Sequence, residues 1–529
     1  MVKKFLPLLF VFISLSVFSQ NSNFTILCIA AHPDDEDGAT LAYYSRIKEY
    51  NAYTIFYTRG EGGQNETGPE LYDELGKLRE RECYEAAEIQ GSKAYFLGFL
   101  DFGYSKTAKE TFRFWGGGDS ILERIVYMIR LIRPDVVITN HDTITTKPKR
   151  QHGHHQVCGI TIYNAFEKAS DPNYHPEQLV DGVEPWQIKK LYFRVYDTTR
   201  TDGLFSIDVY QKDLSGKTIK QIAIDALSKH RTQGMDKLDW ENIPEVANQR
   251  RYELVRSDKM YPVEGSDLFE GLEPIEKSVN FELKSYPTIY SYYKVNPEDS
   301  LRILKSVKHT TWAVGLVSTY DNTLVRILNA FHVGYSVVTP FDVEKGELSS
   351  LIYQTIILDL RAYFYRPDVV KFNEKLLKYV EDGGNLIVFY NKPQDWNGFN
   401  FGPFPIYLTN ERVTEEDTEV KVLEPYLRLF RSPNVIYESD WDGWVQERSV
   451  YLPSDDTLKT SSKYHKLLSM NDENDPVPST SLLYAVCGSG TYIYCSLALY
   501  RQLRVFNEGA LKLFMNMIST RSLDPNQSR

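Results

Sequence analysis

Apolar and polar stretches alternate along residues 24–170 in the pattern of strands and helices. Apolar runs of strand length lie at 24–30, 52–60, 94–99 and 136–140. Amphipathic segments lie between them, at 41–50, 74–91 and 120–133. Strands that alternate with helices predict a mainly parallel sheet covered by helices on both faces. Ligands bind such sheets at the carboxyl ends of the strands, so the residues that follow each apolar run are candidates for function.

A second alternating pattern begins after about residue 300. Its apolar runs lie at 312–318, 335–340, 355–360 and 385–390, and its amphipathic segments at 321–331 and 368–384. Two β segments around a Gly-Ser-Gly turn follow at 481–499, and a last helix at 509–519. Residues 170–285 are less regular, with one clear amphipathic helix at 218–230. Because 529 residues exceed one compact core, we predict two α/β domains, 20–285 and 290–529.

The first nineteen residues have the features of a secretory signal peptide. MVKK is basic, FLPLLFVFISLSVF is apolar, and small residues surround a cleavage point near Ser19. No later run approaches the ~20 apolar residues that a membrane span needs. No cysteine lies at the cleavage point, which argues against a lipid anchor. We therefore expect a secreted or periplasmic protein without a transmembrane segment.

The overall charge and the aromatic content narrow the choice of ligand. The formal net charge of -11 argues against a nucleic-acid-binding protein, whose domain should carry a basic stripe. The 37 tyrosines suit a protein that presents flat rings to sugars. Five cysteines without close spacing do not form a disulfide framework or a zinc knuckle.

Two histidine-containing motifs follow predicted strands and belong to the same edge of the sheet. AAHPDDEDG at 30–38 supplies His32, Asp34 and Asp35, and QHGHHQVCG at 151–159 supplies His152 and His155. Two imidazoles and one carboxylate with an open position are the usual ligand set of catalytic zinc. Asp34 is then a spare carboxylate, placed to take a proton from zinc-bound water.

Each motif also has a simpler interpretation. Histidines three apart are common on helix surfaces, and two aspartates after a strand suit an ordinary turn with a helix cap. Three of the ten histidines fall within 152–155, however, and a fourth lies in HPDDE. This concentration favours a site.

AHPDDE followed by HxxH resembles the LmbE-like, PIG-L-type N-acetylglucosamine deacetylases over roughly residues 24–170. The resemblance implies a Rossmann-like fold with zinc bound by His32, Asp35 and His155. It makes Asp34 the general base. His152 would stabilise the developing oxyanion or protonate the leaving amine.

The chain departs from the family in the second motif, because His-Gly-His-His replaces the frequent His-Pro-Asp-His. The aspartate that commonly steadies the first histidine is thereby replaced by His154. Asp142, in the preceding NHDT, is the alternative partner for His152. The orientation of His152 is therefore open.

Further residues are candidates for substrate binding. Arg59 and Glu61 follow the second strand, and His230 and Gln233 lie just past an amphipathic helix. The alternatives are a solvated loop for the first pair and a structural helix end for the second. Tyr104 or Trp115 would suit a wall that faces a sugar, although aromatic residues are more often core.

The C-terminal domain resembles class I glutamine amidotransferases from 312 to 390. That chemistry needs a cysteine nucleophile at a strand-to-helix turn, and no cysteine lies between Cys158 and Cys487. We expect a non-catalytic domain. The segment 437–448 mixes tryptophans with carboxylates, which suits either a glycan-binding loop or a loop packed between domains.

The sequence thus predicts a hydrolase with one zinc ion per chain, or another divalent metal, that removes the N-acetyl group of an amino sugar or glycoconjugate. An amidase that acts on a sugar–amino-acid conjugate is an alternative within the same chemistry. An extracytoplasmic carbohydrate-binding protein without activity is the alternative from another class. Asp34 discriminates between them, because a binding protein does not need the spare carboxylate.

Overall fold

The described part of the protein contains two seven-stranded sheets, seen here in a computed structural model. The described residues are 24–63, 65–142, 151–197, 199–200, 203–239, 242, 250–261, 265, 267–277 and 281–520. The predicted signal peptide at 1–19 lies outside them. Residues 258–313 join the two sheets, and the domain boundary predicted at 285–290 falls within this connection. We call residues 24–285 the first unit and residues 290–520 the second unit.

The sheet of the first unit has the strand order β3-β2-β1-β4-β5-β7-β6. Its strands are β1 (Thr25–Ala30), β2 (Asn51–Phe56), β3 (Lys93–Phe96), β4 (Val136–Thr139), β5 (Lys190–Arg194), β6 (Leu204–Ile207) and β7 (Arg250–Ser257). The strands from β3 to β5 are parallel, whereas β7 pairs antiparallel with β5 and β6 with β7. The prediction of a mainly parallel sheet is confirmed, with an antiparallel edge from the less regular segment 170–285.

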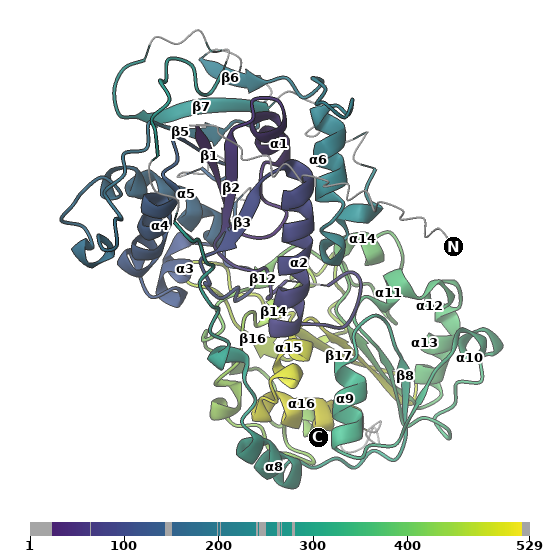
Figure 1. Cartoon of the computed structure of the whole chain (residues 1–529). Helices are drawn as coiled ribbons and strands as arrows, with labels where there is room; N and C mark the ends of the chain where they lie inside the picture. Colours follow the sequence, from purple (N-terminus) through teal and green to yellow (C-terminus); the bar gives the residue numbers. More distant parts are fainter. Residues whose placement is uncertain are drawn as a thin grey trace, which may run out of the picture.

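Helices cover both faces of this sheet (Figure 1). One face carries α1 (Gly38–Arg46), α2 (Asp73–Gln90) and α6 (Ile219–Leu227), and the other carries α3 (Ala108–Phe114), α4 (Gly118–Ile132) and α5 (Gly153–Lys168). Strand β1 is buried along its whole length. Leu27 and Ile29 pack toward α4 and α5, while Ile26 and Cys28 pack toward α1 and α6. An uninterrupted apolar run is what a strand between two helical layers requires.

The sheet of the second unit has the order β15-β17-β18-β11-β10-β8-β9. Its strands are β8 (Val314–Val317), β9 (Tyr335–Val337), β10 (Thr355–Leu358), β11 (Asn385–Phe389), β15 (His465–Lys466), β17 (Leu482–Cys487) and β18 (Gly490–Cys495). The strands from β9 to β18 are parallel, and β17 and β15 add an antiparallel edge. A second parallel-dominated α/β unit is therefore present, as predicted. Its likeness to amidotransferases stays a prediction.

Short elements surround this second sheet. Its helices are α8 (Pro297–Ser306), α9 (Thr323–Ala330), α10 (Pro340–Lys345), α11 (Ala362–Tyr365), α12 (Pro367–Lys371), α13 (Asn373–Glu381), α14 (Pro393–Trp396), α15 (Leu499–Arg504) and α16 (Glu508–Ser519). Two small ladders join β12 (Arg412–Val413) to β14 (Ser449–Val450) and β13 (Lys421–Val422) to β16 (Leu468–Ser469). Among the described helices, none is both long and apolar enough to cross a membrane.

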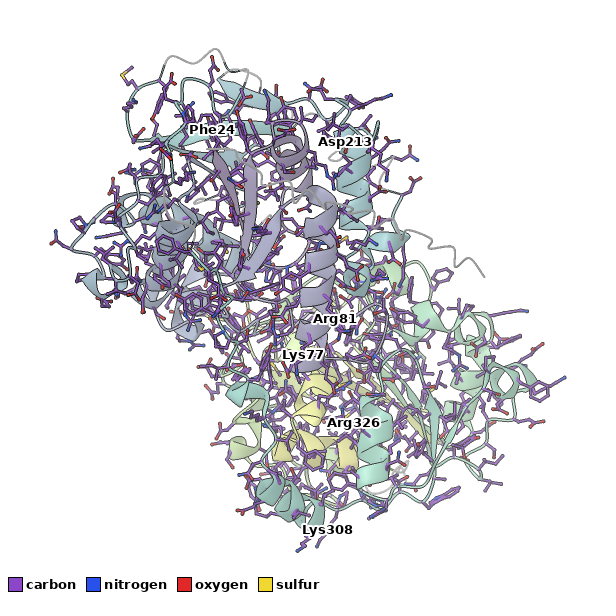
Figure 2. All side chains as sticks on the ribbon, viewed as in Figure 1. Phe24, Lys77, Arg81, Asp213, Lys308 and Arg326 are labelled. Carbon is purple, nitrogen blue, oxygen red and sulfur yellow. The ribbon has the colours of Figure 1, made fainter. Side chains whose placement is uncertain are left out.

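The two units pack directly against each other through the loop after β2 and the start of α2. The rings of Tyr72 and Tyr293 stack with their centroids 3.9 Å apart, and Arg501 Nη1 donates a hydrogen bond of 2.7 Å to the carbonyl oxygen of Gly62. Figure 1 shows α2 reaching from the first unit to the second, and Figure 2 labels Lys77 and Arg81 on this part of the helix. The apolar core of the second unit includes Leu71 and Leu75 of the first.

Candidate metal and catalytic site

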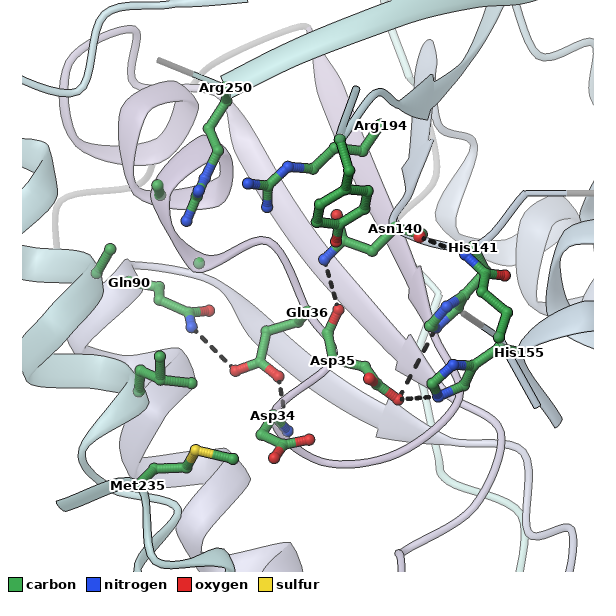
Figure 3. Close-up of a pocket in the computed structure, with 16 residues that line it drawn as sticks. Asp34, Asp35, Glu36, Gln90, Asn140, His141, His155, Arg194, Met235 and Arg250 are labelled. Carbon is green, nitrogen blue, oxygen red and sulfur yellow. Dashed lines mark hydrogen bonds and ion pairs between the residues drawn. The ribbon is translucent and has the colours of Figure 1, made fainter. Parts of the chain in front are cut away.

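The loop between β1 and α1 carries the first motif and turns sharply at Asp34. Asp34 has φ of +81°, a left-handed conformation that is uncommon for residues other than glycine but better tolerated by Asp and Asn. This turn separates two carboxylates that are adjacent in sequence. In Figure 3 the carboxylate of Asp35 points toward His141 and His155, and that of Asp34 lies apart from both histidines.

Asp35 connects the two histidine-containing motifs. Its Oδ2 atom lies 3.0 Å from His32 Nδ1 and 3.2 Å from His155 Nε2. His152 lies beside them, with its ring centroid 4.0 Å from that of His155. Two groups of three residues each place one donor atom per residue within 4.8 Å of the others. The first group is His32, His152 and His155, and the second is Asp35, His141 and His155. The structure thus brings together the predicted ligands from the loop after β1 and from the first turn of α5.

This donor set fits a divalent ion of the zinc type, which prefers imidazole and carboxylate ligands. Two buried nitrogens agree with this. Within the described part of the chain, His152 Nδ1 and His154 Nε2 have no hydrogen-bond partner. Buried polar atoms are rarely left unpaired without a functional reason.

His154 and His141 complete the cluster in ways that the sequence analysis missed. His154 is fully buried, and its Nδ1 lies 2.9 Å from His32 Nε2. The residue that replaces the family's aspartate therefore holds the ring of His32. His141 stacks on His155 with ring centroids 4.3 Å apart, and its Nε2 accepts a hydrogen bond from the backbone N–H of Ala31. Its position two residues after the end of β4 is the signal that could have identified it.

Burial and neighbouring charges shift the pKa values of Asp34 and Asp35 in opposite directions. Burial, followed by repulsion from Asp35, raises the pKa of Asp34 to about 7. Burial also opposes ionisation of Asp35, but His155 beside it lowers the pKa of Asp35 well below its usual range. Burial lowers the pKa of His152 and His154 well below the usual histidine value, which favours the neutral form of both rings. Neutral imidazoles are the form that binds a metal ion.

The side chain of Glu36 holds the loop between β1 and α1 in place, and His230 in turn contacts Glu36. Glu36 Oε2 accepts a hydrogen bond of 3.1 Å from the backbone N–H of Asp34. Its Oε1 lies 3.0 Å from His230 Nε2 and 3.2 Å from Gln90 Nε2. His230 is predicted to contact substrate, but its side chain is fully buried behind Glu36. Its position corrects that prediction, since burial of the ring leaves it no open face.

Arg59 and Glu61 are likewise structural in the described chain. Arg59 forms ion pairs of 2.9 Å with Asp73 and 3.2 Å with Glu80, both on α2. Glu61 is completely buried and accepts hydrogen bonds from the backbone N–H groups of Arg59 and Asp101. Neither side chain lines a cavity at the cluster. Arg59 holds the loop against α2, and Glu61 ties it to the backbone of Asp101, which follows β3.

Gln233 differs from the other three substrate-binding candidates. It ends the short 3-10 helix η2 (Arg231–Gln233), and its Nε2 donates a hydrogen bond of 2.7 Å to the carbonyl oxygen of Pro33. Its side chain lines a cavity beside the histidines. Tyr104 lines the same cavity, whereas Trp115 is core.

Two cavities flank the cluster. One, of about 510 Å³, is lined by residues of the first unit that include Asn140, Arg194 and Arg250 (Figure 3). The other, of about 480 Å³, lies between the two units. Asp34, Asp35, His155 and Met235 line both cavities. A ligand can therefore approach the cluster from either side.

Comparison with known proteins identifies the family. The family model of PIG-L, GlcNAc-PI de-N-acetylase, matches residues 27–166. A 1D-myo-inositol 2-acetamido-2-deoxy-alpha-D-glucopyranoside deacetylase of Frankia alni is 32% identical over 205 residues, which cover 35% of this chain and 67% of the relative. The chain belongs to the PIG-L family. The family model ends within α5 and leaves the second unit unmatched.

Two further relatives of this PIG-L chain carry different names. A diacetylchitobiose deacetylase of Thermococcus kodakarensis is 25% identical over 169 residues, which cover 32% of this chain and 58% of the relative. A mycothiol S-conjugate amidase of Streptomyces coelicolor is 29% identical over 194 residues, covering 34% and 64%. The chain therefore spans less than two thirds of the length of both.

Gly153, the first residue of α5, sits where this chain departs from the family's His-Pro-Asp-His pattern. A Cβ atom at Gly153 would lie 2.3 Å from the carbonyl oxygen of Thr107 and 2.2 Å from Ser105 Oγ. We expect Gly153→Ala to displace the first turn of α5 and its histidines. Displaced ligands should lower the affinity for Zn²⁺ by about 10–100-fold, as measured by competition with a chromogenic chelator.

Gly118→Ala is the matched control for this substitution. Gly118 also begins a helix, α4, and its Cβ would meet nothing closer than 3.8 Å. Its affinity for Zn²⁺ should equal that of the wild type. Equal affinity in both variants would show that α5 is not held by the contact at Gly153.

Proposed function

We propose that this protein is a secreted or periplasmic hydrolase that uses one zinc ion to remove the N-acetyl group from an amino sugar or glycoconjugate. The observation that carries the proposal is the meeting of His32, Asp35 and His155 around one carboxylate oxygen. Membership of the PIG-L family and deacetylases among the relatives support the reaction type. The location rests on the predicted signal peptide.

His32, Asp35 and His155 would hold the metal ion. A divalent ion held there would supply Lewis acidity, which polarises an acetamido carbonyl and acidifies water. His152, whose ring lies against that of His155, would stabilise the oxyanion that develops on the carbonyl oxygen or protonate the leaving amine.

Asp34 would accept the proton of the attacking water. Its carboxylate lines both cavities, so water and substrate can reach it. Its backbone N–H is tied to Glu36, which is itself held by His230 and Gln90. This support fixes the backbone that carries the carboxylate, and a positioned proton acceptor is what general base catalysis needs.

The direct test is metal-dependent acetate release. Purified protein loaded with Zn²⁺ is incubated with N-acetylglucosamine, N,N'-diacetylchitobiose and an N-acetylglucosaminyl inositol, and acetate and free amine are measured together. We expect equal amounts of both products, loss of activity after removal of the metal with a chelator, and recovery when Zn²⁺ is returned.

Other outcomes of this experiment point to the alternatives. An N-aminoacyl sugar is therefore assayed as a fourth substrate. Release of its amino acid, without release of acetate from the three N-acetyl sugars, would identify an amidase, which the relative from Streptomyces coelicolor brings into consideration. Sugar binding without either release would indicate a carbohydrate-binding protein. In both cases the deacetylase proposal would be wrong.

A further inference from the structure

The cavity between the two units combines the candidate catalytic residues with a wall from the second unit. The first unit contributes Asp34, His152 and Tyr104 among others. The second unit contributes side chains of complementary kinds, among them Tyr390, Lys392, Arg412, Glu447, Tyr451 and Arg501. The PIG-L family model does not extend to this wall, because it ends at residue 166.

The topology of both sheets explains why these residues meet. His32 and Asp34 follow the carboxyl end of β1, and Tyr390 and Lys392 directly follow the carboxyl end of β11. Carboxyl ends of parallel strands are the edge at which α/β sheets bind ligands. Here two such edges lie on opposite sides of one cavity, so a ligand at the histidines also faces the second sheet.

The wall is held rigidly against the first unit. Arg501 and Gln446 both donate hydrogen bonds to the carbonyl oxygen of Gly62. On the same loop, Glu66 accepts a hydrogen bond of 3.0 Å from the hydroxyl group of Tyr365 and lies 3.7 Å from Arg361 Nη1. A wall that is fixed before binding loses little entropy when a ligand arrives.

Arg412 joins the wall to the histidine cluster. Its guanidinium lies 5.1 Å from the ring centroid of Tyr104, and that ring lies 5.3 Å from the ring of His152. Arg412 also pairs with the buried Glu447 and donates a hydrogen bond of 2.9 Å to the hydroxyl group of Tyr451. Its charge is therefore compensated within the wall, and its planar group extends an aromatic surface that a sugar ring can cover.

Lys392 is the cation of this wall that forms no ion pair in the described chain, although Glu66 and Asp395 lie near enough to attract its charge. The nearby carboxylates already serve arginines, since Glu66 and Asp395 contact Arg361 and Glu447 contacts Arg412. In the described chain, the ammonium group of Lys392 has no ion-pair partner. Burial, followed by repulsion from Arg361, lowers the pKa of Lys392. A partly buried cation of this kind gains from an anion that binds beside it.

We infer that the second unit is the substrate-selecting half of the active site, and that Lys392 binds an oxyanion carried by the N-acetylated amino sugar. This inference rests on the proposed function, because it places the acetamido group at the histidines and the acidic group at Lys392. A carboxylate, a sulfate and a phosphate share the chemistry that Lys392 recognises.

The test compares acidic and neutral sugars on three proteins. N-acetylglucosamine is assayed beside N-acetylglucosamine 6-sulfate, N-acetylglucosamine 6-phosphate and N-acetylmuramic acid, which separate the three anions. The wild type should prefer at least one acidic sugar by about ten- to hundredfold in kcat/KM, mainly through KM. Lys392→Gln should lose this preference. Lys305→Gln, at an exposed lysine of α8, should retain it.

Calorimetric titration with the same sugars separates this inference from the proposed function. If no sugar releases acetate, the deacetylase proposal fails, but the acidic sugar should still bind the wild type about tenfold or more tightly than N-acetylglucosamine, and Lys392→Gln should abolish the difference. Equal affinity of the wild type for acidic and neutral sugars would overturn the inference. So would an undiminished preference in Lys392→Gln.

Discussion

Replacement of Asp34 by asparagine is expected to lower kcat for acetate release by a factor of about 10²–10⁴, with the metal content unchanged. Asparagine keeps the size of the side chain and tolerates the left-handed backbone found at Asp34. It cannot accept the proton of the attacking water. Asp35, whose Oδ2 contacts His32 and His155, remains in place to hold the metal. The measurements are kcat under saturating substrate and metal content by elemental analysis.

The matched control is Asp181→Asn. Asp181 is exposed and also has a positive φ, +52°, so this variant makes the same exchange on the same kind of backbone outside the site. Its kcat should equal that of the wild type. If Asp34→Asn lost its metal, Asp34 would be a ligand and not the base. If it kept both metal and full kcat, another group would have to activate water.

The first unit shows how far an apolar pattern determines a fold. The run predicted at 24–30 forms β1 (Thr25–Ala30), and the run at 136–140 forms β4 (Val136–Thr139), because both are buried between helical layers and must be continuously apolar. Strand β7 (Arg250–Ser257) could not be predicted in this way. Half of the residues in its sequence RRYELVRS are charged, and its place is set by pairing with β5 and β6.

The candidate site likewise has a part that the sequence pattern predicts and a part that depends on packing. The meeting of His32 and Asp35 with His155 follows from the carboxyl ends of neighbouring strands, which a sequence pattern can indicate. The burial of His230 beneath Glu36 depends on how η2 packs against the loop, and no local pattern encodes it. Prediction from residue type alone therefore confuses a supporting histidine with one that contacts substrate.

The segment 437–448 illustrates why the cavity-lining residues of the second unit could not be predicted from the sequence. Trp441 and Trp444, which suggested a glycan-binding loop, are buried in the apolar core. Glu447 of the same segment reaches the cavity, where it pairs with Arg412. The residues that contact a ligand are thus chosen by the packing of the two units, and the most conspicuous side chains are used for that packing.

Removal of the imidazole of His155 is expected to abolish retention of the metal and, with it, activity. His155 bridges the two motifs, because its Nε2 lies 3.2 Å from Asp35 Oδ2 and its ring packs against those of His141 and His152. His155→Ala leaves His32 and Asp35 as two ligands from a single loop, which hold a divalent ion poorly. Loss of a metal that contributes several kcal/mol to the transition state lowers kcat/KM by about a thousandfold or more.

Metal content after dialysis against a weak chelator decides the matter without any knowledge of the substrate. About one zinc ion per chain is expected in the wild type and in the control His465→Ala, whose histidine is exposed on β15. Much less should remain in His155→Ala. Full retention in His155→Ala would assign the metal to the neighbouring set of His32, Asp101 and His154, whose donor atoms also lie within 4.8 Å of one another. Because His154 would then be a ligand, the replacement of the family's aspartate by histidine would mark a displaced metal site instead of a substituted support.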